Sequence, residues 1–256
     1  MDKIVDSINV NRDRYVEELK QYLAIPSISA LPQHAGDVRR CAEWTAEEMK
    51  RIGLQTVRVE ETSGHPAVYG EWLGAEGAPT ILLYGHYDVQ PVDPVNLWTS
   101  PPFEATVRDG ELYARGAVDD KGQVFMHFKA VEAHMKANGR LPVNMKFLIE
   151  GEEEVGSANL DNYVRDRKSQ LASDVVVISD SPMFDRGDVH VDLALVVHRA
   201  ARVELAVAQR RLEGRRVPQV ERVGRLHVVV AVEDRGGRAL RRWPFAEDDR
   251  VAVGRQ

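Results

Sequence analysis

The chain has 256 residues, of which 43% are hydrophobic, and it contains one cysteine, Cys41. This length allows one large domain or two modest ones, each with a hydrophobic core. A single cysteine excludes an internal disulfide and any zinc site made of cysteines. Because the N-terminus is charged and no apolar run is long enough to cross a bilayer, we expect a cytoplasmic protein without a signal peptide or a membrane span.

The formal net charge of −6 conceals two parts of different composition. Residues 1–186 carry 20 basic and 30 acidic side chains, which gives −10, and residues 187–256 carry 14 and 10, which gives +4. All the basic residues of the second part are Arg, and it contains no Ser, Thr, Ile, Tyr, Asn or Met. We therefore expect one domain over residues 1–187 and a tail of different character over residues 188–256.

Helical and extended patterns alternate through the first part of the chain. Apolar residues at helical spacing predict helices over residues 7–25, 37–53, 120–139 and 158–171. Apolar segments between turn residues predict strands at 54–60, 67–73, 79–85, 143–150 and 174–179. This alternation indicates an α/β fold, a three-layer sandwich around a mostly parallel sheet.

Acidic side chains and one imidazole follow the ends of three predicted strands. These strands lead into GHYDVQP (85–91), EGEEEVGS (150–157) and SDSPMF (179–184). Open α/β sheets bind ligands beyond the carboxyl ends of their strands, so the three segments are expected at one edge. The turn ARGAVDDKG (114–122) precedes a predicted helix and adds more carboxylates. The side chains expected at this edge are His86, Asp88, Asp119, Asp120, Glu150, Glu152, Glu153, Glu154 and Asp180.

Carboxylates gathered at a partly buried edge repel one another and lose hydration, so a cation has to offset their charge. Basic side chains near them are few, chiefly Arg115 and Lys121. A divalent metal or a metal pair is therefore expected, with zinc first and manganese or cobalt as alternatives. Asp88 lies two residues after His86 on the same side of an extended chain and can hold its ring. The alternative is that these stretches are only polar surface turns.

The adjacent carboxylates Glu153 and Glu154 predict a reaction type. Neighbouring side chains point in different directions, so one can bind the metal while the other faces a metal-activated water. A free carboxylate at that position can take the proton of the water and pass it to a leaving amine. The sequence therefore predicts metal-assisted hydrolysis.

The stretch LLYGHYDVQPVDPVNLWTSPPFEATVRDGELYARGAVDDKGQ (82–123), followed by EGEEEVGS and ISDSPMF, resembles the two-zinc metallopeptidase family of carnosine dipeptidases, glutamate carboxypeptidase, aminoacylase and succinyl-diaminopimelate desuccinylase. The dipeptidase branch is the most similar. The resemblance implies cleavage of the amide bond of a dipeptide or N-acyl amino acid by a zinc-bridged water. It implies no nucleic-acid or membrane partner, and a cis peptide bond between Asp119 and Asp120.

The resemblance also implies a role for each of six side chains. His86 and Asp180 would bind one zinc ion, Glu154 the other, and Asp119 both; Asp88 would orient His86, and Glu153 would be the general base. Glu152 is expected to be a solvated loop residue, and Glu150 receives no role. His127 and His134 are expected to be packing or surface residues.

The sequence departs from the family after about residue 187. Family members continue with a lid domain, which carries a substrate-polarising His and forms the usual dimer, and then return to complete the sheet with a further zinc-binding His. No matching segment is present here, so the sheet is expected to be incomplete, the activity weak or absent, and the oligomeric state unknown. An out-of-frame origin of residues 188–256 would explain their composition. The alternative function is a catalytically inactive remnant that acts through binding.

Overall fold

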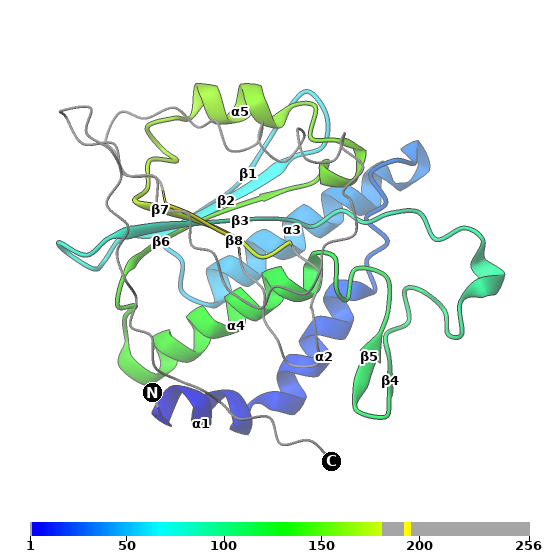
Figure 1. Ribbon diagram of the computed structural model, residues 1–256, viewed down its shortest axis with the longest axis horizontal. Helices are drawn as coiled ribbons and strands as arrows, with labels where there is room; N and C mark the ends of the chain where they lie inside the picture. Colours follow the sequence, from blue (N-terminus) through cyan, green and yellow to red (C-terminus); the bar gives the residue numbers. More distant parts are fainter. Residues whose placement is uncertain (1, 181–191, 196–256) are drawn as a thin grey trace, which may run out of the picture.

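The computed structural model describes residues 2–180 and 192–195 of the chain (Figure 1). The helices are α1 (Asp2–Val10), α2 (Arg12–Leu23), α3 (Ala35–Arg51), α4 (Lys121–Asn138) and α5 (Leu160–Asp166), with the short 3₁₀ helices η1 (Pro32–His34), η2 (Val95–Leu97) and η3 (Glu153–Val155). The strands are β1 (Thr56–Glu60), β2 (Ala67–Trp72), β3 (Thr80–His86), β4 (Thr106–Arg108), β5 (Glu111–Tyr113), β6 (Asn144–Glu150), β7 (Val175–Ile178) and β8 (Asp192–Leu195).

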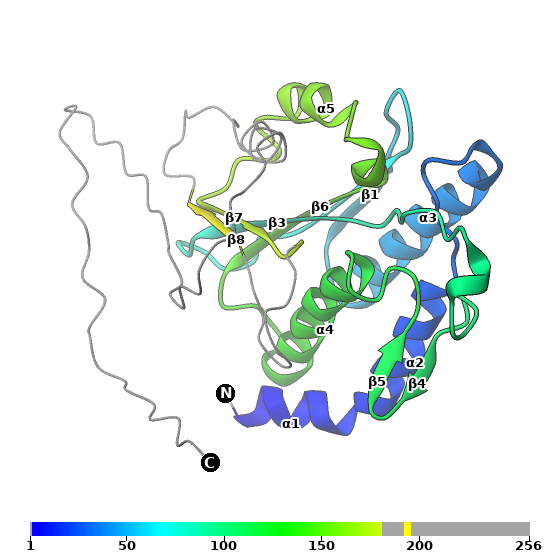
Figure 2. The same ribbon diagram turned by 45° about the vertical axis from the view of Figure 1, so that its right-hand side comes forward.

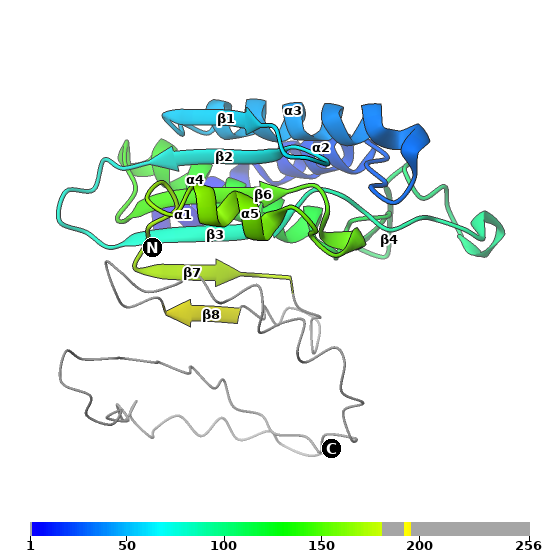
Figure 3. The ribbon, with the colours of Figure 1, turned by 90° about the horizontal axis from the view of Figure 1, so that it is seen from above.

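The main sheet has the strand order β1-β2-β6-β3-β7-β8, seen in Figure 3. Its centre is parallel, because β3 pairs in parallel with both β6 and β7. The outer pairs β1–β2, β2–β6 and β7–β8 are antiparallel. The predicted α/β class is confirmed, and the predicted parallel arrangement holds for the three central strands of a mixed sheet.

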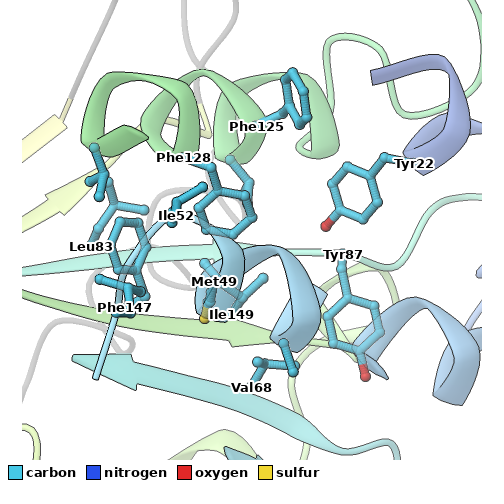
Figure 4. Close-up of a cluster of buried hydrophobic side chains, with 14 of the residues drawn as sticks. Tyr22, Met49, Ile52, Val68, Leu83, Tyr87, Phe125, Phe128, Phe147 and Ile149 are labelled. Atoms are coloured by element: carbon cyan, nitrogen blue, oxygen red, sulfur yellow. The ribbon is translucent and has the colours of Figure 1, made fainter. Parts of the chain in front are cut away.

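Helices cover both faces of this sheet (Figures 1 and 2). α1 to α4 lie on one face, and α5 lies on the other. Alternation along the strands supplies each face with its own apolar residues, since successive strand side chains point in opposite directions. Phe147 of β6 belongs to the core beneath α3 and α4, shown in Figure 4, whereas the next residue, Leu148, belongs to the smaller core beneath α5.

Of the nine predicted elements, seven differ from the sequence expectation only at their ends, and two differ more. The helix expected at 7–25 is broken at Asn11, whose side-chain amide donates to the Ser7 carbonyl at 2.7 Å. An amide side chain that bonds the backbone in this way competes with the helical hydrogen bonds. The helix expected at 158–171 ends at Asp166. The β4–β5 hairpin was not predicted, because each of its strands has only three residues.

The predicted tail, residues 188–256, lies outside the described residues except for β8. The division of the chain at residue 187 and the proposed out-of-frame origin of the tail therefore stay predictions. In the part of the chain that the structure describes, none of the helices has the length and apolar character needed to cross a membrane.

Candidate metal centre

Three parallel strands end at the same edge of the sheet, on the right in Figure 3. β3 ends at His86, which lies in register with Glu150, the last residue of β6. β7 ends nearby at Ile178, and Asp180 follows it. The turn before α4 brings Asp119 to this edge from outside the sheet. The structure therefore gathers the segments that the sequence predicts to converge.

Three side chains in this region could hold one metal ion. His86 Nε2 lies 3.2 Å from Asp119 Oδ1 and 3.9 Å from Asp180 Oδ2. One ligand atom from each of the three residues lies within 4.8 Å of the others. His86 is fully buried, whereas the Asp119 side chain is 51% exposed. The group is thus anchored in the core and open to solvent on one side.

The His86 ring is held through its other nitrogen. Nδ1 lies 3.1 Å from the backbone oxygen of Asp88, which accepts its hydrogen bond, and 3.2 Å from the Oδ1 atom of the same residue. A proton on Nδ1 leaves Nε2 directed at Asp119 and Asp180. Burial opposes a charge on the imidazole, but hydrogen bonds to Asp119 and Asp88 raise the pKa of His86 well above its ordinary value. The surroundings of Nε2 therefore favour a bound cation.

The turn that carries Glu153 and Glu154 is η3, directly after β6. The backbone N–H groups of Glu153 and Glu154 donate to the Asp88 carboxylate at 3.3 and 3.1 Å. The Glu154 carboxylate accepts a hydrogen bond of 2.6 Å from Gln90. Burial raises the pKa of Glu154, although the Gln90 hydrogen bond opposes this effect. Burial, with a smaller effect from Asp180, raises the pKa of Glu153 to about 7.

Asp119 and the next residue differ in environment although they share a peptide bond, which is cis as the resemblance implied. The hydrogen bond from His86 lowers the pKa of Asp119. Asp120 is 1% exposed, and its Oδ2 accepts the His86 backbone N–H at 3.0 Å. Burial raises the pKa of Asp120 to about 7. Asp120 thus holds the backbone of His86, and Asp119 lies next to the His86 ring.

The donor set and the local charge are suited to a divalent metal. The two basic residues expected near the carboxylates donate hydrogen bonds to backbone carbonyls. Lys121 donates to the Tyr22 and Ile25 carbonyls at 3.2 and 2.7 Å, and Arg115 donates to the Pro91 carbonyl at 2.9 Å. One imidazole and several carboxylates are ligands that zinc and manganese accept.

A second group of carboxylates, Glu18, Glu48 and Glu132, also lies within 4.8 Å. Here cations already occupy the centre, because Lys129 forms ion pairs with all three. Arg51 adds another, 2.6 Å from Glu48 and 2.9 Å from Glu132. This group is an ion-pair network between α2, α3 and α4 and not a second metal site.

Two further glutamates of the EGEEEVGS segment are buried. The prediction that Glu152 is a solvated loop residue is wrong, since it is 9% exposed and accepts a 2.8 Å hydrogen bond from Asn159. Glu150 is 4% exposed and accepts hydrogen bonds from Tyr84 and Ser157. Both carboxylates accept hydrogen bonds from the segment between β6 and α5, from Ser157 and from Asn159, and so stabilise this turn.

Comparison with known proteins identifies the family of this chain. The sequence profile described as peptidase family M20/M25/M40 matches residues 82–250, which is more than half of the chain. The chain belongs to this family. The match includes β3 from Leu82 onward, the cis peptide, η3 and β7, which carry the candidate site residues. It also extends past residue 187 into the tail.

Dipeptidases are prominent among the M20 relatives. The chain is 34% identical over 195 residues to the Beta-Ala-His dipeptidase of Homo sapiens, covering 71% of this chain and 38% of that protein. It is 33% identical over 219 residues to the Cysteinylglycine-S-conjugate dipeptidase of Corynebacterium striatum, covering 83% of this chain and 47% of that protein. The chain thus spans less than half the length of these relatives.

The fold agrees with a solved M20 structure. The crystal structure of human carnosine dipeptidase 1 superposes with a TM-score of 0.67 at 34% identity, over 70% of this chain and 41% of that chain. The predicted resemblance to the dipeptidase branch of the family is therefore confirmed.

Proposed function

We propose that this chain carries the metal centre of a metal-dependent dipeptidase, with zinc as the metal. The convergence of His86, Asp119 and Asp180 at one sheet edge is the observation that carries the proposal. The names of the relatives, which are dipeptidases, supply the substrate class. Because the chain spans 38% and 47% of the length of those two relatives, the activity of the whole protein belongs to the proposal as well.

The ligand assignment follows the geometry for one ion and the family pattern for the other. His86 Nε2 and the carboxylate of Asp180 would hold the first zinc ion, and Asp119 would be shared by both ions. Glu154, on the neighbouring η3 turn, would hold the second. Support for its position comes from Gln90, which binds its carboxylate, and from Asp88, which accepts its backbone N–H.

Glu153 is the residue that we assign to proton transfer. When bound, the zinc ions would supply an activated water and polarise the carbonyl of the scissile amide. Glu153 lies next to a ligand and is half-buried, so its carboxylate can take a proton from the attacking water and return it to the amine that leaves. Asp88 keeps His86 in the orientation that leaves Nε2 free. Cytoplasmic location stays a prediction.

Metal analysis of the purified chain, followed by cleavage assays on a panel of dipeptides, tests this function. We expect zinc to bind and chelators to abolish cleavage. The Glu153→Gln variant should still bind zinc but cleave dipeptides about 10²- to 10⁴-fold more slowly, because it lacks the general base. Glu47→Gln is the control, since that side chain is 73% exposed on α3.

The outcomes separate the two candidate functions. Zinc binding with cleavage that depends on Glu153 supports the dipeptidase. Zinc binding without cleavage of any dipeptide would favour the alternative of a binding protein that keeps the fold and the metal. A chain that takes up no zinc, manganese or cobalt would overturn the metal centre.

A further inference from the structure

The segment Ile25–Ser29, between α2 and η1, lies against the metal-site loop that follows β3. Ser27 donates through its hydroxyl to the Tyr87 carbonyl at 2.6 Å and accepts the Val89 backbone N–H at 3.0 Å. Lys121 fixes the start of the segment by donating to the Ile25 carbonyl at 2.7 Å. Three bonds to three different atoms hold this backbone, so the side chains that it carries have defined positions.

Ser29 uses this fixed position to bind Asp88. Its hydroxyl donates to Asp88 Oδ2 at 2.6 Å, and its own carbonyl is bound by His65 Nε2 at 3.2 Å. Ser29 is 9% exposed and Asp88 is fully buried. A short hydrogen bond to a buried carboxylate is stronger than a neutral one, because the acceptor is charged and water does not compete.

The Asp88 carboxylate in turn holds both halves of the metal centre. Oδ1 lies 3.2 Å from His86 Nδ1 and 3.3 Å from the backbone nitrogen of Glu153. Oδ2 accepts the backbone N–H of Glu154 at 3.1 Å, in addition to the Ser29 hydroxyl. Rotation of this one carboxylate would therefore disturb the imidazole and the glutamate turn together.

We propose that Ser29 is a positioning residue of the metal centre that acts through Asp88. Ser29 binds the Oδ2 atom of Asp88, whose orientation sets the directions of His86 and of the Glu153–Glu154 turn. Removing its hydroxyl leaves the carboxylate with one hydrogen bond fewer to oppose rotation about its side-chain torsion. The inference rests on the proposed function, because it assigns a role toward the metal of that same site.

Zinc affinity of the purified chain, measured by competition with a chromophoric chelator, tests the inference. Ser29→Ala is expected to weaken zinc binding about tenfold, at the lower end of the loss for groups that orient metal ligands. Ser27→Ala is the matched control, since it removes a buried hydroxyl from the same segment whose acceptor is the Tyr87 carbonyl and not Asp88. Its zinc affinity is expected to stay at the wild-type value, although the thermal stability of the metal-free protein should fall for both variants.

A double-mutant cycle shows whether Ser29 acts through Asp88. In an Asp88→Ala background, Ser29→Ala is expected to cause no further loss of zinc affinity, because the group through which it acts is gone. Ser29→Thr, which keeps the hydroxyl, is expected to bind zinc as the wild type does, and it tests the role of the hydroxyl if Ser29→Ala does not fold.

Three results would overturn the inference. They are equal zinc affinities of the Ser29→Ala and Ser27→Ala variants, an additive loss in the Asp88→Ala background, and a loss in Ser29→Thr as large as that in Ser29→Ala. In each case a wild-type chain that binds zinc leaves the proposed function standing. A wild-type chain that binds no metal would overturn both.

Discussion

His86 Nε2 and Asp119 Oδ1 lie 3.2 Å apart, although the first side chain is fully buried and the second is half exposed. This pair joins the end of a core strand to a surface turn. The proposed metal site therefore has one ligand in the core and another on an exposed side chain.

Asp119→Ala should weaken zinc binding by more than the 10- to 100-fold that is typical of residues behind the ligands, because it removes a ligand itself. The competition assay used for Ser29 measures this loss. Asp166→Asn, at the end of α5, is the control and should bind zinc as the wild type does. Equal affinities of the two variants would contradict the assignment of Asp119.

Gly85→Ala should destabilise the chain by about 1–3 kcal/mol, the usual cost of overpacking. A Cβ atom at this position would lie 2.5 Å from Asp120 Oδ2 and 2.6 Å from a Val124 methyl carbon, both in the core. Urea unfolding of the metal-free protein gives the free energy of unfolding. Gly36→Ala, where a Cβ atom meets nothing within 4 Å, should be neutral or stabilising, since alanine is the better helix former. A loss of the same size in both variants would show that contact with Asp120 is not the cause.

Lys121→Met should lower the free energy of unfolding by about 1–3 kcal/mol. Methionine can fill the fully buried space but cannot donate to the Tyr22 and Ile25 carbonyls. Zinc affinity should stay close to the wild-type value, because the two bonds of Ser27 still hold the segment. Lys50→Met, at a side chain that is 52% exposed, serves as the comparison and should change neither quantity. Wild-type stability of the Lys121 variant would disprove this anchoring role.

The ion-pair network between α2, α3 and α4 should stabilise the fold less in acid. Burial alone would raise the pKa of Glu132, but hydrogen bonds from Arg51, Lys136 and Arg14 outweigh it and hold this pKa well below 4.5. A carboxyl whose pKa is lower in the folded state stabilises the fold above its unfolded pKa and loses that contribution as the pH falls. The free energy of unfolding should therefore decline below about pH 4.5, the ordinary pKa of a glutamate.

Glu132→Gln provides the test of this acid sensitivity. At pH 7 the variant should be less stable by about 1.5–3 kcal/mol, the value of hydrogen bonds to a charged group. Its decline below pH 4.5 should be shallower than that of the wild type, since the titrating group is gone. Glu17→Gln, at a side chain that is 65% exposed, should follow the wild-type curve. If the free energy of unfolding fell with pH equally in the wild type and the Glu132 variant, Glu132 would not be the cause of the acid sensitivity.

Much of the site could be predicted because it depends on strand ends. Parallel strands place whatever follows them at one edge, so the positions of His86 and Asp180 followed from three apolar runs and their order. The roles of Glu153 and Glu154 as base and ligand remain predictions. Their turn is where expected, but a side chain on a turn can take several directions that sequence does not specify.

What sequence reasoning missed depends on contacts between distant residues. Glu152 looked solvated because acidic runs usually are, and only the fold shows Asn159 folded back over it. Ser29 gave no signal at all, because a serine hydroxyl in a loop becomes informative only when its acceptor, 59 residues away, is known. The break at Asn11 was in principle detectable, since asparagine is a poor residue for the middle of a helix.

The bonds of Asp88 join stretches that are 59 and 65 residues from it in sequence, one before it and one after. No short peptide cut from this chain can hold all the groups that define the centre. Tight zinc binding should therefore require the segment before α3 and the turn after β6 to be docked together, which makes zinc binding a report on whether the whole sheet edge has assembled.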